Sequence, residues 1–134
     1  MNPLNNKKDY WVYASPKIET AGKWMLFVNK DELEIAWDKV SLATEGHRLG
    51  IASKCSTGRE NTLAKDQDTK LICVYTKDSE NKEDVERVLV EIRKLGFSER
   101  LFYKTDNATR AGNYGEKSWL YDSGYFETNL WRDL

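Results

Sequence analysis

The stretch that most constrains the fold runs from residue 70 to residue 96, where a strand pattern leads directly into a helix pattern. "KLICVYT" at 70–76 is a continuous β-branched and aromatic run, which is typical of a strand in the middle of a sheet. An apolar face then repeats with helical spacing through Ile92, and Gly96 ends the helix. The connection between them contains no glycine, so the phosphate-binding turn of a doubly wound parallel sheet is not expected.

Four more strands and one more helix are expected around this unit. Short apolar or alternating runs at 23–29, 50–56, 100–106 and 118–121 predict the strands. A capping pattern and an apolar face over 29–46 predict the helix. Short strands with two amphipathic helices favour an α+β fold, in which a curved, mostly antiparallel sheet is backed by two or more helices.

Length and charge limit the classes of protein to which the chain can belong. Its 134 residues fit one domain, with an N-terminal arm at 1–21, a sheet-and-helix core at 22–122 and an aromatic C-terminal tail at 123–134. The formal net charge of -1 argues against a duplex DNA partner, since no global basic field is present. No apolar run is long enough to span a bilayer or to act as a signal peptide, so we expect a cytoplasmic protein without a membrane partner.

The cysteines and the single histidine give no sign of a metal centre. Cys55 and Cys73 fall inside expected strands and lack metal-type spacing, which favours free thiols; a disulfide between neighbouring strands is the alternative. His47 beside Gly46 is typical of a helix-end or surface residue. We therefore expect no metal and no cofactor.

Alternation along the strands gathers lysines on one face of the sheet. Lys54 and Lys104 fall on the less apolar face of their strands, which the helices would leave to solvent or to a ligand. Two cations on neighbouring strands attract anions, and aromatic rings nearby would stack on a planar base. The alternative is that these lysines are solvated strand residues that discourage edge pairing. The candidate ligand-binding residues are Lys54, Arg59, Lys70, Lys104, Arg110, Tyr114, Trp24 and Trp119.

Several segments together resemble a known family. The runs "GKWMLFV", "AWDKV", "RLGIASKCST", "LICVYTKDSENKEDVERVLVEIRKLG" and "FYKTDNATRAGNYG", within roughly residues 22 to 115, are similar in order and spacing to the family of the basophilic-leukaemia-expressed protein. The resemblance implies an eIF4E-like fold, that of the mRNA cap-binding translation initiation factor. It also implies that Lys54 and Lys70 correspond to the basic residues that meet the cap phosphates. The Trp-Glu pair with which the cap-binding factor reads its methylated base has no counterpart here, so cap binding itself is not implied.

Three functions follow as hypotheses. The first is a non-enzymatic module that captures a phosphorylated ligand, most simply a nucleotide or nucleotide second messenger, in a sequestering or regulatory role. The second is a phosphothreonine lyase acting on a phosphoprotein, an activity with which the resembled family is often labelled; it would use Lys104 as base and His47 as acid. The third is a protein-interaction module in which the tail from Trp119 to Trp131 pairs with a protein partner or a second copy.

Overall fold

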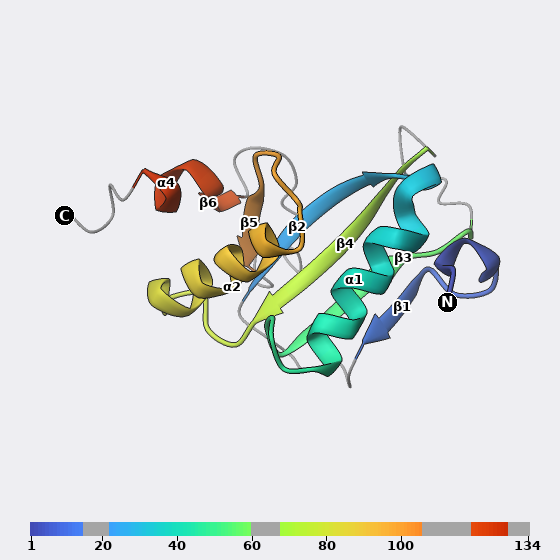
Figure 1. Ribbon diagram of the computed structural model, residues 1–134, viewed down its shortest axis with the longest axis horizontal. Coiled ribbons are helices and arrows are strands. Elements are labelled where there is room, and N and C mark those ends of the chain that lie inside the picture. The colour runs from blue at the N-terminus through green and yellow to red at the C-terminus, as the bar shows by residue number, and fades with distance from the viewer. Residues whose placement is uncertain (15–21, 60–67, 106–118, 129–134) are drawn as a thin grey trace.

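The computed structural model describes residues 1–14, 22–59, 68–105 and 119–128. Six strands form one sheet in the order β1-β3-β4-β2-β5-β6, and every neighbouring pair is antiparallel (Figure 1). This arrangement confirms the predicted α+β class. The strands are β1 (Trp11–Ala14), β2 (Gly22–Asn29), β3 (Ala52–Ser56), β4 (Thr69–Thr76), β5 (Phe102–Thr105) and β6 (Trp119–Asp122).

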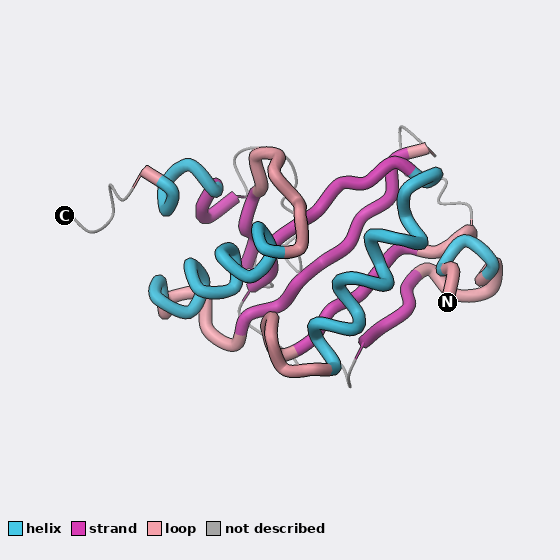
Figure 2. The backbone as a smooth tube through the Cα atoms, in the orientation of Figure 1, coloured by secondary structure: helices cyan, strands magenta, loops and turns pink. Residues whose placement is uncertain are grey.

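The helices, cyan in Figure 2, begin or end at polar and glycine signals of the sequence. The Asn81 side chain accepts a hydrogen bond from the Asp84 amide at 3.2 Å and caps one helix, and Gly46 ends another. Asn29 caps a short 3₁₀ turn that comes before the expected helix. None of the helices in the described ranges is both long and apolar enough to cross a bilayer. The helical elements are η1 (Pro3–Asn5), η2 (Lys30–Glu32), α1 (Leu33–Glu45), α2 (Lys82–Lys94) and α4 (Ser123–Glu127).

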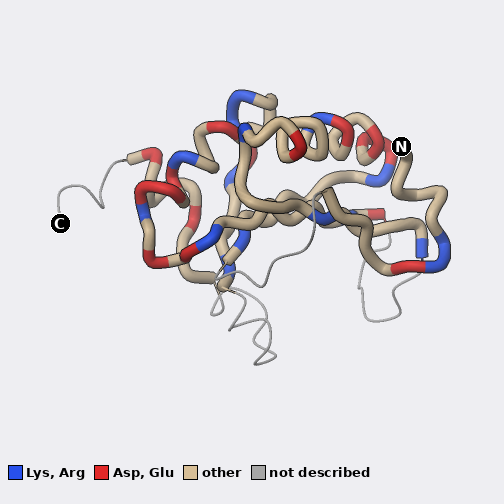
Figure 3. Tube along the Cα trace, turned by 90° about the horizontal axis from the view of Figure 1, so that it is seen from below, with Lys and Arg blue, Asp and Glu red and all other residues tan. Residues whose placement is uncertain are grey.

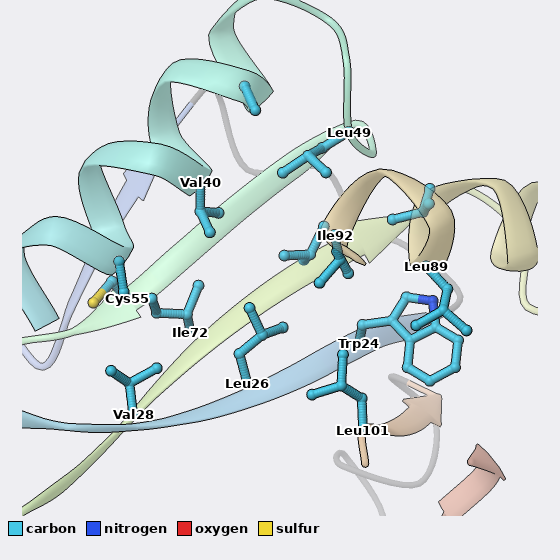
Figure 4. Packing of buried hydrophobic residues seen from close by; sticks show 14 of the residues in the cluster. Trp24, Leu26, Val28, Val40, Leu49, Cys55, Ile72, Leu89, Ile92 and Leu101 are labelled. Carbon is cyan, nitrogen blue, oxygen red and sulfur yellow. The ribbon is translucent and has the colours of Figure 1, made fainter. Parts of the chain in front are cut away.

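Helices α1 and α2 pack on the same face of the sheet, and the main core lies between them and the strands (Figure 4). Val40 on α1 and Ile92 on α2 point toward sheet residues such as Leu26. At the end of the sheet under α2, the buried Trp24 indole donates a hydrogen bond to the Val85 carbonyl at 3.0 Å. In the side view, α1 lies along one side of the sheet (Figure 3). The opposite sheet face is therefore built from the alternate residues of each strand.

Both ends of the chain contribute more regular structure than the sequence predicts. Part of the expected N-terminal arm is strand β1, which forms the edge of the sheet beside β3. Part of the expected aromatic tail is α4, whose Phe126 is 1% exposed and meets Trp24 edge to face at a centroid distance of 6.0 Å. A two-point ion pair between Arg93 and Glu127, at 2.8 and 2.9 Å, ties α4 to α2. Phe126 thus belongs to the core and not to a free tail.

The two cysteines are free and lie on opposite faces of the sheet. Cys55 belongs to the core under the helices, whereas Cys73 belongs to a small separate cluster with Ala52 and Tyr75. Their Cβ atoms therefore point apart, which a disulfide does not allow. The prediction of free thiols is confirmed, and burial, followed by the neighbouring Cys73, raises the pKa of the Cys55 thiol to about 12.

Both thiols should resist alkylation in the folded protein. A thiol reacts as its thiolate, and both thiols are buried, which limits access by the reagent. For Cys55 the raised pKa also lowers the thiolate fraction. We expect iodoacetamide to modify Cys55 and Cys73 far more slowly in the folded protein than after denaturation, and the intact mass before reduction to equal that of the dithiol. A native mass lower by the two hydrogens of a disulfide would contradict this.

Gly22 is required at the start of β2 because a neighbouring ring occupies the space of a side chain. An ideal Cβ at this position would lie 2.3 Å from the Tyr103 hydroxyl oxygen and 2.4 Å from its ring carbons. Tyr103 is fully buried and shares a hydrogen bond with Thr76, so it cannot easily move away.

We expect Gly22→Ala to lower the free energy of unfolding by about 1–3 kcal/mol, as overpacked core positions do. Urea denaturation measures the change. Gly46→Ala is the matched control, because its φ is -82° and the nearest atom to an added Cβ, the Leu42 carbonyl oxygen, lies 3.3 Å away. Equal losses in the two variants would contradict the close approach of Tyr103.

Candidate functional site

The candidate site is the sheet face opposite α1 and α2, which we call the lysine face. It is separate from the main core, which holds the alternate residues of the same strands. It spans β1 to β6, so residues distant in sequence meet there through strand pairing. Its residues include Trp11, Tyr13, Lys23, Met25, Ala52, Lys54, Cys73, Tyr75, Phe102, Lys104 and Trp119.

Two lysines stand directly opposite each other at the centre of this face. Lys23 on β2 pairs in register with Lys104 on β5, and each is only 5% exposed. Burial, followed by the charge of Lys23, lowers the pKa of Lys104 below its ordinary value. Like charges on directly opposed strand residues repel, so this position favours a negatively charged partner.

A tyrosine ring separates this pair from a third lysine. Lys23 pairs with Lys104 on one side and with Tyr75 of β4 on the other. Tyr75 is 3% exposed, and the Lys23 ammonium lies 5.7 Å from the centre of its ring. The Lys54 ammonium lies 5.9 Å from the same ring and 4.0 Å from the ring of Trp11 on β1. Both distances are within cation–π range, so aromatic faces hold the Lys54 charge in place.

Stacked aromatic rings form the other margin of the lysine face. Phe102 on β5 and Trp119 on β6 stack with a centroid distance of 3.7 Å and an interplanar angle of 23°. Trp119 pairs with Lys104 next to a β-bulge, which is an irregularity of pairing that re-aims side chains. The Arg100 guanidinium lies 5.3 Å from the Phe102 ring. The site therefore has cations at its centre and aromatic rings at both margins.

The structure agrees with the predicted orientation of Lys54 and Lys104 and corrects their spacing. Both lie on the face opposite the helices, as the alternation predicts. They do not lie on neighbouring strands, because β4 and β2 stand between β3 and β5. Lys104 is also not left to solvent, since its side chain is almost fully buried.

Two candidates lie on the wrong face for this site. Trp24 is fully buried in the core, where it meets Tyr103 edge to face at 5.4 Å, so it cannot stack on a ligand. Lys70 has the same strand parity as the core residue Ile72, and its charge acts on Cys55, which is also on the helix side. The implied match of Lys70 to a phosphate-binding residue therefore fails on orientation.

The remaining candidates are not joined to the lysine pair. The Arg59 guanidinium stacks 3.8 Å from the Tyr10 ring and donates a hydrogen bond to the Lys8 carbonyl at 2.8 Å, so it holds the N-terminal segment. His47 is exposed in the turn after α1, with a φ of 59°. Arg110 and Tyr114 lie outside the described residues. Within the described ranges, no group of three or more His, Cys, Asp or Glu side chains could hold a metal ion.

Sequence reasoning missed Lys23, Tyr75 and Trp11. The signal for Lys23 was present, because it neighbours the core residue Trp24 in a strand and so must point the other way. Tyr75 likewise neighbours the core residue Val74 in its strand and so points to the other face. Trp11 could not be placed, since the pairing of β1 with β3 joins segments distant in sequence, such as Trp11 and Ser56.

Comparison with known families and structures identifies the relatives of the chain. The model of the basophilic leukemia-expressed protein Bles03 family matches residues 8–112. The chain belongs to this family. Solved structures, 77 chains in number, also match this chain.

Similar solved structures are eIF4E proteins. A schistosome eIF4E complexed with m7GpppA and 4E-BP has a TM-score of 0.60 and 13% identity, over 78% of this chain and 59% of the neighbour. The C. elegans eIF4E-3 in complex with Mextli and a cap analog has a TM-score of 0.56 and 19% identity, over 69% and 54%. The Ascaris suum eIF4E-3 with m7G cap has a TM-score of 0.56 and 15% identity, over 78% and 57%. The eIF4E-like fold is thus confirmed, and the chain spans less than two thirds of these proteins' length.

The lowered pKa of Lys104 predicts a specific pH dependence of stability. Between the folded-state pKa and the ordinary lysine value of 10.5, the unfolded chain binds more protons than the folded one. The free energy of unfolding therefore rises with pH across this window, as the buried charge is lost. In Lys104→Met this contribution is absent.

We expect the difference in unfolding free energy between the wild type and Lys104→Met to shift in favour of the wild type as the pH rises toward the ordinary lysine pKa of 10.5. Urea titrations at several pH values measure it. Lys77→Met, which removes an exposed lysine, is the control for general effects of charge. A shift of opposite sign for Lys104 would show that its charged form is stabilised on folding.

Proposed function

We propose that this protein is a binding module whose lysine face captures a phosphorylated ligand, with a nucleotide as the ligand class, and that it acts without catalysing a reaction. The observation that carries the proposal is the directly opposed and buried pair Lys23 and Lys104. A phosphate accepts charge-assisted hydrogen bonds from two ammonium groups at once and relieves their repulsion.

The aromatic margin supports a nucleotide over inorganic phosphate. Phe102 and Trp119 lie within one strand of Lys104, and both are partly exposed. Base stacking on such rings contributes about 1–3 kcal/mol per base and tolerates any base. A ligand with a phosphate on the lysines and a base on the rings would use both features.

The solved relatives support the same ligand class. The schistosome and Ascaris proteins are complexed with m7GpppA and m7G cap respectively, and the fold is shared. Two of these eIF4E proteins are also in complex with a protein, 4E-BP in one and Mextli in the other. A nucleotide-binding role, with a protein partner as a further possibility, is therefore consistent with the fold.

The lyase hypothesis gains no support from the described contacts. It needs His47 close to Lys104, so that acid and base act on one substrate. His47 follows α1, whereas Lys104 lies on the sheet face turned away from α1, and none of the described contacts joins them. A module that only binds needs nothing beyond the charge and stacking groups already in place.

A nucleotide thermal-shift screen tests the proposal. We expect AMP, GMP and their triphosphates to raise Tm, and Lys104→Ala and Lys23→Ala each to reduce the ligand-induced shift by more than half. Isothermal titration calorimetry then gives Kd. Because both lysines are nearly buried, access requires local motion of the chain, and we expect an association rate below about 10⁵ M⁻¹s⁻¹.

Lys77→Ala is the matched control, because it removes one lysine from the exposed turn after β4 and should leave the ligand-induced shift unchanged. A flat screen for the wild type would rule out a nucleotide. Equal shifts in wild type and in Lys104→Ala would rule out the lysine face as the site.

A further inference from the structure

We propose that one open stretch of the β2 edge, together with the groove beside it, takes an extended peptide from a protein partner, which adds to the sheet as a short antiparallel strand. The peptide carries a large apolar side chain between two basic residues. We call this site the edge groove, and it is formed by residues 27–29 of β2, by α1 and by the segment 95–99 after α2. The edge groove does not include the lysine pair, so the proposal is independent of the nucleotide-binding function.

Strand β2 is longer than its neighbour β5, so part of one β2 edge has no strand beside it among the described residues. β2 pairs with β4 from Gly22 to Asn29, but with β5 only from Gly22 to Met25 (Figure 1). In the same register the residue opposite Phe27 would be Arg100, which lies outside β5. No backbone hydrogen bond between these two residues is present in the described part of the chain. The edge is therefore open from Phe27 onward.

The backbone amide and carbonyl of Phe27 point to this open edge. On the other side of β2, Phe27 pairs with Leu71, whose amide donates to the Ser56 hydroxyl of β3 at 2.9 Å and so points away from β2. In an antiparallel ladder, the backbone groups of both residues in such a pair are turned away from each other. The Phe27 groups therefore face the side that β5 leaves open, where an added strand would bond to them.

Hydrogen bonds on the β5 side give the same direction. The Leu101 amide donates to the Ser123 hydroxyl at 3.0 Å, and the Leu101 carbonyl accepts from the Ser123 amide at 2.8 Å, both on the β6 side. Backbone groups alternate in direction along a strand, so those of Phe102 point to its partner Met25 on β2. Phe27 follows Met25 by two residues, and its groups have the same direction. Two separate sets of contacts thus agree on the open donor and acceptor.

Apolar side chains line the groove beside this edge, which has a volume of about 340 Å³. Val28 faces the helices with the rest of the core, so the residue opposite it in an added strand would point to the same side. There it would meet Ile35 of α1 and, after α2, Leu95 and Phe97. Ile35 is 66% exposed, so a large apolar side chain in the groove would remove apolar surface from water.

The charges of the edge groove favour a basic peptide. Its charged side chains, none of which belongs to an ion pair between described residues, are Glu32, Lys39 and Glu99. The Lys39 ammonium lies 3.9 Å from the position of a Cβ at Gly96, beside the C-terminal end of α2, where the helix dipole favours a cation. The pKa of the neighbouring Arg93 is raised chiefly by its hydrogen bond to Glu127 and least by the charge of Glu99. The two groove carboxylates thus remain for charge-assisted hydrogen bonds from basic residues of a partner.

The outer strands of a second copy do not match these carboxylates. Neither β1 nor β6 contains a lysine or arginine, and β6 ends on Asp122. A basic peptide from another protein therefore suits the edge groove better than the sheet edge of the same chain.

Fluorescence anisotropy of the full chain with defined peptides tests the proposal. The probe is Thr-Arg-Thr-Phe-Thr-Arg-Thr with an N-terminal fluorescein and a C-terminal amide, and its central Phe would lie opposite Val28. We expect Kd to rise about tenfold or more when Ser replaces this Phe at constant charge, and when both adjacent threonines, which would pair with Phe27 and Asn29, are N-methylated. N-methylation of the central Phe removes an N–H that points away from β2, and should change Kd by less than about threefold.

Two surface substitutions on α1 locate the site. Ile35→Arg places a cation in the groove and should weaken the probe about tenfold or more. Leu42→Arg is the matched control, because Leu42 lies on the same helix, is 61% exposed and does not line the groove. Hydrogen exchange of the wild type gives a second readout: the saturating probe should slow the Phe27 amide, and should leave the Leu26 amide, which points to β4, unchanged.

Four results would each overturn the proposal and leave the nucleotide-binding function standing. The first is a probe that does not bind at millimolar concentration. The second is equal binding of the two N-methylated probes, which would mean that no strand is added to β2. The third is equal weakening by Ile35→Arg and Leu42→Arg, which would put the peptide elsewhere. The fourth is a dimer in light scattering that Ile35→Arg abolishes, which would make a second copy the occupant.

Discussion

The pairing of β2 with β4 along eight residues is the interaction on which the rest of the structure depends. It fixes the register of the two central strands, and a slip of one residue would exchange every side chain between the two faces. In the observed register, Trp24, Leu26 and Ile72 face the helices, and Lys23 and Tyr75 face the other way. The hydrophobic core therefore determines the position of the cations, because burying the apolar set leaves them no other face.

The two faces of the sheet bury different kinds of side chain. Under α1 and α2 the core is apolar, and its buried Trp24 indole and Thr44 hydroxyl are hydrogen bonded. On the lysine face, ammonium groups lie against aromatic rings, which stabilise a cation without neutralising it. The same strands thus bury an apolar set on one face and lysines beside aromatic rings on the other.

Much of the fold could be predicted from the sequence, because its elements carry local signals. The strand at 69–76, the helix ending near Gly96 and the parity of Lys104 all follow from periodicity within one segment. The candidate site was only partly predictable, because it depends on strand order. Nothing local shows that β2 lies between β4 and β5, so Lys54 and Lys104 were expected on neighbouring strands and Lys23 was overlooked. Lys70 was misplaced because the resemblance to a family gave it a role without regard to the face on which it lies.

The placement of the two cysteines on opposite faces gives the molecule a pair of internal reporters. Cys73 lies on β4 two residues from Tyr75, and Cys55 lies in the core under α1. A buried thiol reacts only while its surroundings are open, so its labelling rate is proportional to the population of the open state. The ratio of the two rates in one sample therefore separates opening of the lysine face from opening of the helical layer. A ligand on the lysine face would slow labelling of Cys73 more than labelling of Cys55, without any engineered probe.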